Sequence, residues 1–200
     1  MSIVKLGKIR VRRAPEAARE HILSAAEQLM VEQGPLALKL ADVAAAAEVS
    51  NASVLHHFGS IDGLHAALMD RMVHQLVAGV LALSDRAGDR EDQNGAVVQA
   101  LFDVFETRGA ARLAAWLELT GEWRRLTSVR EAVRSVIVKR VSRGDLDTAQ
   151  VEDLVLASVT LAMGAGLFGR SLAQLIGSPP SRAREVAAEV LRAYTLAHRE

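Results

Sequence analysis

Hydrophobic residues recur at helical spacing along almost the whole chain, and this periodicity limits the possible folds more than any other feature. Before Gly34, for example, Ile22, Ala26 and Met30 follow one another at four-residue intervals and fall on one face of a helix. No segment shows the strict alternation of apolar and polar residues that is typical of a half-buried strand. The sequence therefore predicts an all-α fold of about nine helices.

Helix-breaking and helix-capping residues divide this pattern into segments. The predicted helices cover about residues 15–33, 39–47, 51–58, 61–84, 93–108, 110–125, 128–144, 147–175 and 181–198. Ser50 and Asp147 are expected to cap the helices that follow them, because their side-chain oxygens can accept a hydrogen bond from an unpaired N–H group. Gly59 is expected to end the third helix, and Ser128 with Glu131 has the spacing of a capping box.

The composition and the N-terminus exclude several classes of protein. Half of the 200 residues are hydrophobic, which is too many for a disordered chain, and the absence of Cys excludes a disulfide scaffold and a Cys-based zinc site. The first residues lack the apolar segment of a secretory signal. The longest uncharged apolar run, residues 154–168, is shorter than the roughly 20 residues of a membrane span. We therefore expect a cytoplasmic protein without a membrane partner.

Catalytic motifs are also missing from the sequence. It has no Gly-rich phosphate loop, no G-x-S-x-G elbow, no HExxH pair and no Cys nucleophile. His56 and His57 are adjacent, but neighbouring residues of a helix point about 100° apart and neither has a partner at i+4, which argues against a metal site. The sequence predicts neither an enzyme nor a bound cofactor or metal.

The charges are balanced overall but not along the chain. The sequence has 24 Lys and Arg against 24 Asp and Glu, yet its first 14 residues contain five cations and no acid. These cations are Lys5, Lys8, Arg10, Arg12 and Arg13. A basic arm before a structured segment suits a polyanion such as nucleic acid, because each neutralised phosphate releases counterions. The alternative is a solvated tail without a binding role.

Three predicted helices within residues 15–60 form a helix-turn-helix unit, because two short helices are joined by only a few residues. Residues 22–68 contain the stretches IL-SAAEQLM-EQG, LADVAAAAEVS and SVLHHFGS-DGL-AAL, in that order. In these motifs the sequence resembles the TetR family of bacterial transcriptional regulators. The resemblance implies a DNA-binding head, residues 15–60, followed by a helical ligand-binding and dimerisation body, residues 61–200.

The second short helix of such a unit lies in the major groove of DNA and presents its first residues to the bases. Asn51 can bind adenine through two hydrogen bonds, and Ala52 and Leu55 can pack on a thymine methyl group. The candidate DNA-contacting residues are Lys39, Ser50, Asn51, Ala52, Ser53, Leu55, His56 and His57, together with the five cations of the arm. The alternative for Asn51 and Ser53 is ordinary helix-start chemistry without DNA.

Four positions depart from the TetR pattern. The recognition helix has Leu55 where Tyr is usual, and the next helix starts with Ile61 where Lys usually meets a phosphate. Lys39 stands in place of the Thr or Ser that opens the preceding helix. Glu48 stands in place of the Gly of the turn, so either Glu48 is strained or the turn has a different form. Since the recognition helix has no Lys or Arg, phosphate affinity must come from Lys39, helix N-termini, the arm and Arg19.

The last two predicted helices are the best candidates for a homodimer interface. The first of them is apolar nearly all round, and Gly164, Gly166 and Gly169 permit close approach of another helix. The candidate interface residues are Leu161, Ala165, Phe168, Leu172, Val186, Val190 and Tyr194. A two-fold dimer would place two recognition helices about 34–36 Å apart, so the DNA operator is expected to be a pseudo-palindrome.

A ligand pocket is expected among the middle helices. Its candidate lining residues are Phe102, Phe105, Trp116, Leu119, Thr120, Trp123, Thr160, Met163, Leu167 and Phe168. Large apolar residues at helical spacing are more often plain core, and we expect this of at least half of them. Any pocket lined in this way would suit a small, mostly apolar molecule.

Together these features predict a sequence-specific DNA-binding transcriptional regulator. A repressor is the expected form, because blocking a promoter requires only occupancy, and a small apolar effector would release it from its operator. The alternative is an interaction protein of the same fold that has lost specific DNA binding, which the residues Leu55 and Ile61 would suit.

Overall fold

A computed structural model describes residues 15–85, 90–142, 144 and 146–197, and the five cations of the predicted basic arm lie outside these residues. The helices are α1 (Pro15–Gln33), α2 (Leu40–Ala46), α3 (Asn51–Phe58), α4 (Ile61–Ser84), α5 (Arg90–Phe102), α6 (Ala110–Thr120), α7 (Thr127–Val141), α8 (Thr148–Gly164), α9 (Arg170–Leu175) and α10 (Arg182–Ala197). Short turns of other helix types are η1 (Pro35–Ala37), η2 (Asp103–Thr107), η3 (Glu122–Arg125) and η4 (Ala165–Gly169). No strand occurs among the described residues, and the predicted all-α class is confirmed.

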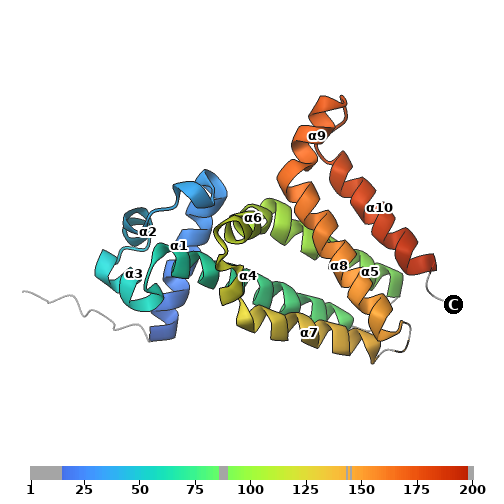
Figure 1. The fold of residues 1–200 in the computed structure, drawn as a ribbon, viewed down its shortest axis with the longest axis horizontal. Helices are drawn as coiled ribbons and strands as arrows, with labels where there is room; N and C mark the ends of the chain where they lie inside the picture. The colour runs from blue at the N-terminus through green and yellow to red at the C-terminus, as the bar shows by residue number, and fades with distance from the viewer. Residues whose placement is uncertain (1–14, 86–89, 143, 145, 198–200) are drawn as a thin grey trace, which may run out of the picture.

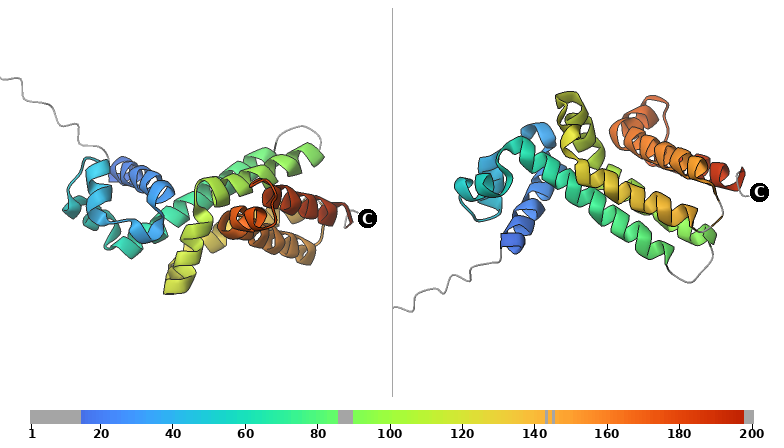
Figure 2. Two further views of the ribbon diagram at one scale, coloured as in Figure 1. Left: turned by 90° about the horizontal axis from the view of Figure 1, so that it is seen from above. Right: turned by 60° about the horizontal axis from the view of Figure 1, so that its bottom comes forward.

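The helices are arranged around α4. Figure 1 shows α1, α2 and α3 grouped at one end, with α4 leading from them into the larger group formed by α5 to α10. Within that group α4 packs against α5, α6 and α7, and α8 packs against α7 and α10. The two further views in Figure 2 show the same elongated arrangement, with α1–α3 and the C-terminal helix at opposite ends.

Three of the predicted helix boundaries depend on local chemistry and are confirmed. The Ser50 hydroxyl accepts a hydrogen bond from the Ser53 N–H at 3.1 Å and caps α3, and Gly59 ends that helix with a φ of 74°. Asp147 caps α8 through a capping box, in which its carboxylate accepts from the Gln150 N–H at 2.8 Å. These signals lie within a few residues of each boundary, so the sequence alone is enough to locate them.

The capping box predicted at Ser128 and Glu131 is wrong. Helix α7 begins at Thr127, its N-cap is Leu126, and no side chain caps it. The Ser128 hydroxyl instead donates a hydrogen bond to the carboxylate of Asp70 in α4. The Ser128 hydroxyl, which the local pattern predicts to be a cap, therefore forms a tertiary contact between α7 and α4 instead.

Two predicted helices end earlier than expected. The helix predicted over 110–125 stops at Thr120, because Gly121 adopts a left-handed φ of 73° and a 3₁₀ turn follows. The helix predicted over 93–108 is α-helical only as far as Phe102, and its last turn widens into the π-helical segment η2. Segments of this type are often found at functional sites.

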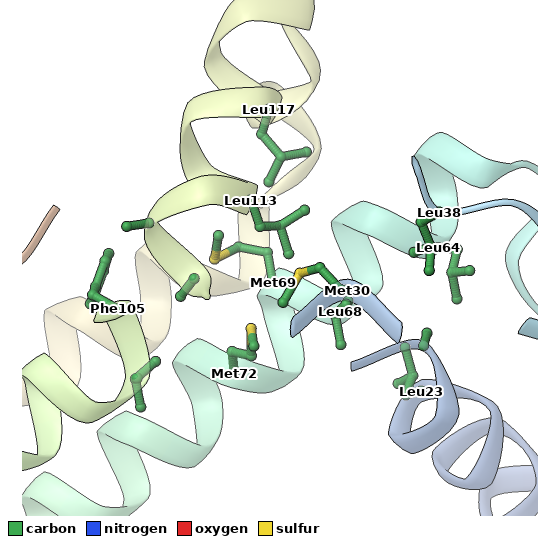
Figure 3. Packing of buried hydrophobic residues seen from close by; sticks show 14 of the residues in the cluster. Leu23, Met30, Leu38, Leu64, Leu68, Met69, Met72, Phe105, Leu113 and Leu117 are labelled. Carbon is green, nitrogen blue, oxygen red and sulfur yellow. The ribbon is translucent and has the colours of Figure 1, made fainter. Parts of the chain in front are cut away.

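One hydrophobic core runs through the head and into the body. In Figure 3, Leu23 and Met30 of α1 lie beside Leu64 and Leu68 of α4, and Met30 also lies beside Leu113 of α6. All five side chains are fully buried. Burial of each such side chain stabilises the fold by about 1.5–3 kcal/mol. The head is therefore held against α4 and α6 by shared packing.

Two glycines permit helices to approach closely. A Cβ atom on Gly63 would lie 2.0 Å from the carbonyl oxygen of Phe58, so only glycine fits the sharp connection between α3 and α4. A Cβ atom on Gly166 would lie 2.7 Å from the Cβ of Ala111 and 2.8 Å from the carbonyl oxygen of Phe105. Gly166 therefore brings η4 against α6 and η2.

Two helical runs, Ile61–Leu83 and Thr148–Leu175, are long and apolar enough to span a membrane by length and composition alone. In α4 the apolar side chains of Leu64, Leu68 and Met72 are fully buried in the core, as in soluble helical proteins. The second run continues beyond the apolar stretch considered in the sequence and exposes much of its surface. The absence of a membrane partner therefore stays a prediction.

Candidate nucleic-acid interface and internal cavity

Helix α3 separates a buried face from an exposed one. Val54 is fully buried, and the ring of Phe58 lies under the guanidinium of Arg19, 5.2 Å from the ring centroid. On the other side Asn51, Ala52 and His56 are exposed, and Leu55 is 43% exposed. Figure 1 shows α3 at the outer end of the molecule, away from the body. The predicted base-contacting residues therefore share one accessible face.

The polar residues around this face have different environments. The Ser50 hydroxyl accepts the capping bond from Ser53, and its own proton is still available to an outside acceptor such as a phosphate oxygen. Lys39, the N-cap residue of α2, is exposed. Ser53 and His57 are only half-buried. Arg19 covers Phe58, so it supports α3 from its inner side.

The turn between α2 and α3 contains a strained residue. Glu48 has a φ of 53°, in the left-handed region that favours glycine. The next residue, Val49, donates its N–H to the carbonyl oxygen of Ala44 at 2.9 Å, which closes the C-terminus of α2. The sequence left open whether Glu48 is strained or the turn has a different form. In the structure the turn is an ordinary one and Glu48 is strained.

Arginine side chains tie the head to the body. Arg71 of α4 is largely buried and donates to the carbonyl oxygen of Leu23 at 3.0 Å and to the carboxylate of Glu20 at 2.8 Å. It also forms an ion pair with Glu27. Arg108, which follows η2, donates to the second oxygen of Glu27 at 2.6 Å. Because Glu27 lies on α1, it links both arginines of the body to the head.

A buried histidine lies where α4 passes α6. The ring centroid of His65 is 4.2 Å from that of Trp116, and the backbone of Pro35 is the polar group beside the imidazole. Burial lowers the pKa of His65 below its usual value, and the negative charge of Asp62 and a hydrogen bond to the backbone of Pro35 oppose this shift only in part. His65 is therefore neutral at pH 7, as its apolar surroundings require.

The body contains a partly open cavity of about 430 Å³ among α4–α8 and α10. Its walls are mostly apolar. Phe105, Trp123 and Met163 are the predicted pocket residues that line it. The sequence analysis missed the contribution of α7, where Val129, Val133 and Val136 face the cavity. Their spacing of four and three residues is itself a helical stripe, so this wall could have been found from the sequence.

The other seven predicted pocket residues do not line this cavity. Phe102 is buried beneath Arg184 of α10, and Trp116 packs on His65. Two more project outward, Leu119 at 88% exposure and Phe168 at 58%. The remaining three are Thr120 and Thr160, which are exposed, and Leu167, which is half-buried. Helix α6 turns its opposite face, with Ala114 and Leu117, to the cavity.

The predicted dimer residues lie on the outer faces of α10 and of the run from α8 to α9. The exposed members are Phe168, Leu172, Val186 and Val190. The half-buried members are Leu161, Ala165 and Tyr194. In Figure 1 the two helical runs lie side by side at the edge of the body opposite α7, in agreement with the packing of α10 against α8 and η4. Together they present an apolar surface to solvent.

Comparison with known proteins finds a family model that matches the N-terminal part of the chain. Residues 22–68, which run from α1 into α4, match the family model described as bacterial regulatory proteins, tetR family. The chain also superimposes on the multidrug binding protein EbrR, solved in complex with imidazole, with a TM-score of 0.58 and 26% sequence identity over 96% of this chain and 97% of that one. This part of the chain, the head and the start of α4, therefore resembles regulators of the tetR family.

Two curated relatives of the chain are regulators by name. HTH-type transcriptional regulator BetI of Stenotrophomonas maltophilia is 34% identical over 100 residues, which are 50% of each protein. HTH-type transcriptional activator FasR of Mycolicibacterium smegmatis is 33% identical over 101 residues, which are 50% of this chain and 46% of that protein. The chain therefore spans about half the length of the curated relatives it matches.

Proposed function

We propose that the chain is a sequence-specific DNA-binding transcriptional regulator, and that it acts as a homodimeric repressor. The observation that carries this proposal is the exposed face of α3, where Asn51, Ala52 and His56 stand clear of the fold while Val54 anchors the helix. Side chains of this kind can read base edges in the major groove. The match of residues 22–68 to the tetR family model supports the same function.

The second candidate is an interaction protein of this fold that no longer binds specific DNA. Leu55 and Ile61 favour it, because in the resemblance described above Leu55 replaces the usual Tyr of the recognition helix and Ile61 replaces a Lys that meets a phosphate. The exposed amide of Asn51 at the start of α3 favours the regulator, since within the described residues this side chain projects into solvent, where it can reach a base.

In the proposed mechanism a small, mostly apolar effector enters the cavity and releases the repressor from a pseudo-palindromic operator. The binding of imidazole by EbrR supports a small-molecule site in the body. The effector must favour one dimer geometry over another to change the affinity for DNA. A coupling free energy of about 1–3 kcal/mol would change that affinity about 5–150-fold.

The π-helical segment η2 can transmit this change, because it contacts three parts of the molecule. Phe105 lines the cavity, and Asp103 accepts a hydrogen bond from Arg184 of α10 at 2.8 Å. Directly after η2, Arg108 binds Glu27 of the head. A shift of η2 on effector binding would therefore reach both the candidate dimer surface and the DNA-binding head.

The experiment that tests the function is a selection of genomic DNA fragments by the full chain, followed by binding measurements at several salt concentrations. We expect an enriched pseudo-palindrome and an affinity that falls steeply with salt. Asn51→Ala should relax the base preference at one position in each half-site, whereas Glu32→Ala, on an exposed part of α1, should not. Removal of residues 1–13 should weaken binding to all sequences and flatten the salt slope.

The results would separate the two candidates. If no sequence is enriched and affinity does not vary with salt, the interaction protein is favoured and the regulator is refuted. Equal salt slopes before and after removal of residues 1–13 would refute a role for the arm alone.

A further inference from the structure

The walls of the cavity are aliphatic along most of its length. Helix α7 lines one side from Leu126 to Arg140, and at a rise of 1.5 Å per residue this side is about 20 Å long. Valines of α4, α5, α7 and α8 line the stretch between its ends. Valine side chains in helices have one strongly preferred rotamer, so these walls keep their shape when a ligand enters. The ligand that fits such a space has an elongated apolar part.

The charged side chains that line the cavity in the described part of the chain are engaged or stand in solvent. The ammonium of Lys139 is paired with Asp85 at 2.6 Å, and the guanidinium of Arg140 donates to the carboxamide oxygen of Asn94 at 2.8 Å. The third, Glu118 of α6, is exposed, so an ion pair with it would be weak. A charged ligand would therefore give up its hydration and would have to displace an existing partner, which disfavours charge in this cavity.

Two uncharged polar side chains share one part of the wall. Asn94 from the start of α5 and Thr195 from the end of α10 line the cavity, and both also line a second cavity of about 60 Å³ between these two helices. Figure 1 shows these ends of α5 and α10 on the side of the body farthest from the head. The polar part of a neutral ligand is therefore expected at this end.

Asn94 and Thr195 offer opposite hydrogen-bonding groups. A guanidinium can only donate, so the amide oxygen of Asn94 faces Arg140 and its NH₂ group can donate to a ligand. The Thr195 hydroxyl donates its proton to the carbonyl oxygen of Leu191 at 2.9 Å, so its oxygen can accept from a ligand. A hydroxyl group is the simplest uncharged group that accepts from one side chain and donates to the other.

We propose that the cavity binds a neutral aliphatic alcohol, whose chain lies along the valines and whose hydroxyl group lies at Asn94 and Thr195. The ligand hydroxyl accepts a hydrogen bond from the Asn94 amide and donates one to the Thr195 oxygen. This inference deepens the proposed function and rests on it only for the consequence of binding, because the ligand class follows from the cavity itself.

The test measures binding of four probes to the full chain without DNA, by titration calorimetry below their solubility and micelle limits. The probes are decanol, its methyl ether, decanoate and decyltrimethylammonium. We expect decanol to bind at least about tenfold more tightly than either charged probe. It should bind about three- to tenfold more tightly than the ether, which can accept a hydrogen bond but cannot donate one. A charged probe or an ether that binds as tightly as decanol would overturn the inference.

Variants locate the hydroxyl group. Thr195→Val should weaken decanol binding about three- to tenfold and leave ether binding within about twofold, because only the alcohol donates to this oxygen. Asn94→Asp keeps an acceptor for Arg140 but removes the amide hydrogens, so it should weaken binding of both probes. Thr160→Val is the matched control, because Thr160 is exposed on α8 and does not line the cavity, and it should leave all affinities unchanged.

An unchanged preference for decanol over its ether in Thr195→Val would overturn the inference. The ranking of the four probes on the unmodified chain tests it even if a variant does not fold.

The proposed function can fail separately from this inference. If decanol binds as expected but does not change operator binding, the ligand class stands and the effector role of the cavity is wrong. If another compound releases the operator while decanol does not bind, the regulator stands and the alcohol ligand class is wrong.

Discussion

At the scale of single residues, Glu48 is the clearest strained position. A left-handed conformation costs an L-residue such as Glu48 about 1–2 kcal/mol, and glycine avoids this cost. Glycine also raises the conformational entropy of the unfolded chain, which cancels part of the stabilisation. Because the Glu48 side chain is exposed, we expect Glu48→Gly to raise the free energy of unfolding by about 0.5–1 kcal/mol in urea denaturation. Ala45→Gly, on the exposed side of α2, is the control and should lower it by about 1 kcal/mol. The same loss in both variants would contradict the strain.

His65 should make the fold less stable in acid. Its pKa in the folded chain is lowered, so below about pH 6.5 the unfolded chain takes up a proton that the folded chain does not. The free energy of unfolding should then fall by up to about 1.4 kcal/mol per pH unit until the folded pKa is reached. His65→Leu should reduce this loss between pH 7.5 and 5.5, with the other five histidines unchanged. If the free energy of unfolding changed with pH in the same way in the unmodified chain and in His65→Leu, this role of His65 would be contradicted.

At the scale of elements, Gly166 determines how closely η4 approaches α6. We expect Gly166→Ala to lower the free energy of unfolding by about 1–3 kcal/mol, because its Cβ would collide with Ala111 and with the backbone of Phe105. Gly79→Ala is the matched control, since Gly79 lies in α4 with open space around it and should gain about 1 kcal/mol of helix propensity. Thermal unfolding measures the stability of both variants. If Gly166→Ala were as stable as the unmodified chain, the close contact of residue 166 with Ala111 and Phe105 would be excluded.

Helix boundaries could be predicted where the residues that set them act within a single element. Ser50, Gly59 and Asp147 act within their own turns, so the sequence locates these boundaries. Ser128 has an equally good local pattern, but its hydroxyl binds Asp70 on another helix, and no local signal reports that contact.

The exposed face of α3 could be predicted, whereas most of the cavity wall could not. In a short amphipathic helix such as α3, the position of Val54 in the core determines which residues lie on the solvent-exposed face. The middle helices have apolar residues on several faces, so the sequence does not say which face meets the cavity. On α6 the large residues Trp116 and Leu119 point elsewhere, while the smaller Ala114 lines the cavity.

At the scale of the whole molecule, the exposed apolar surface of η4, α9 and α10 should be covered by a second copy. We expect light scattering to give twice the mass of one chain, and Leu172→Arg to give a monomer that binds operator DNA at least tenfold more weakly. Leu119→Arg is the control, because Leu119 is 88% exposed on α6, outside this surface, and it should leave the dimer intact. A monomeric unmodified chain would refute the dimer.

The core shared by α1, α4 and α6 has a consequence for protein engineering. Met30 and Leu23 of the head are covered by side chains that follow residue 60, so a fragment cut at that boundary would leave them in water. A chimera that grafts this head onto another body would therefore have to include the first three turns of α4, and it would have to recreate the surface around Leu113 as well. The portable unit is larger than the part that touches DNA.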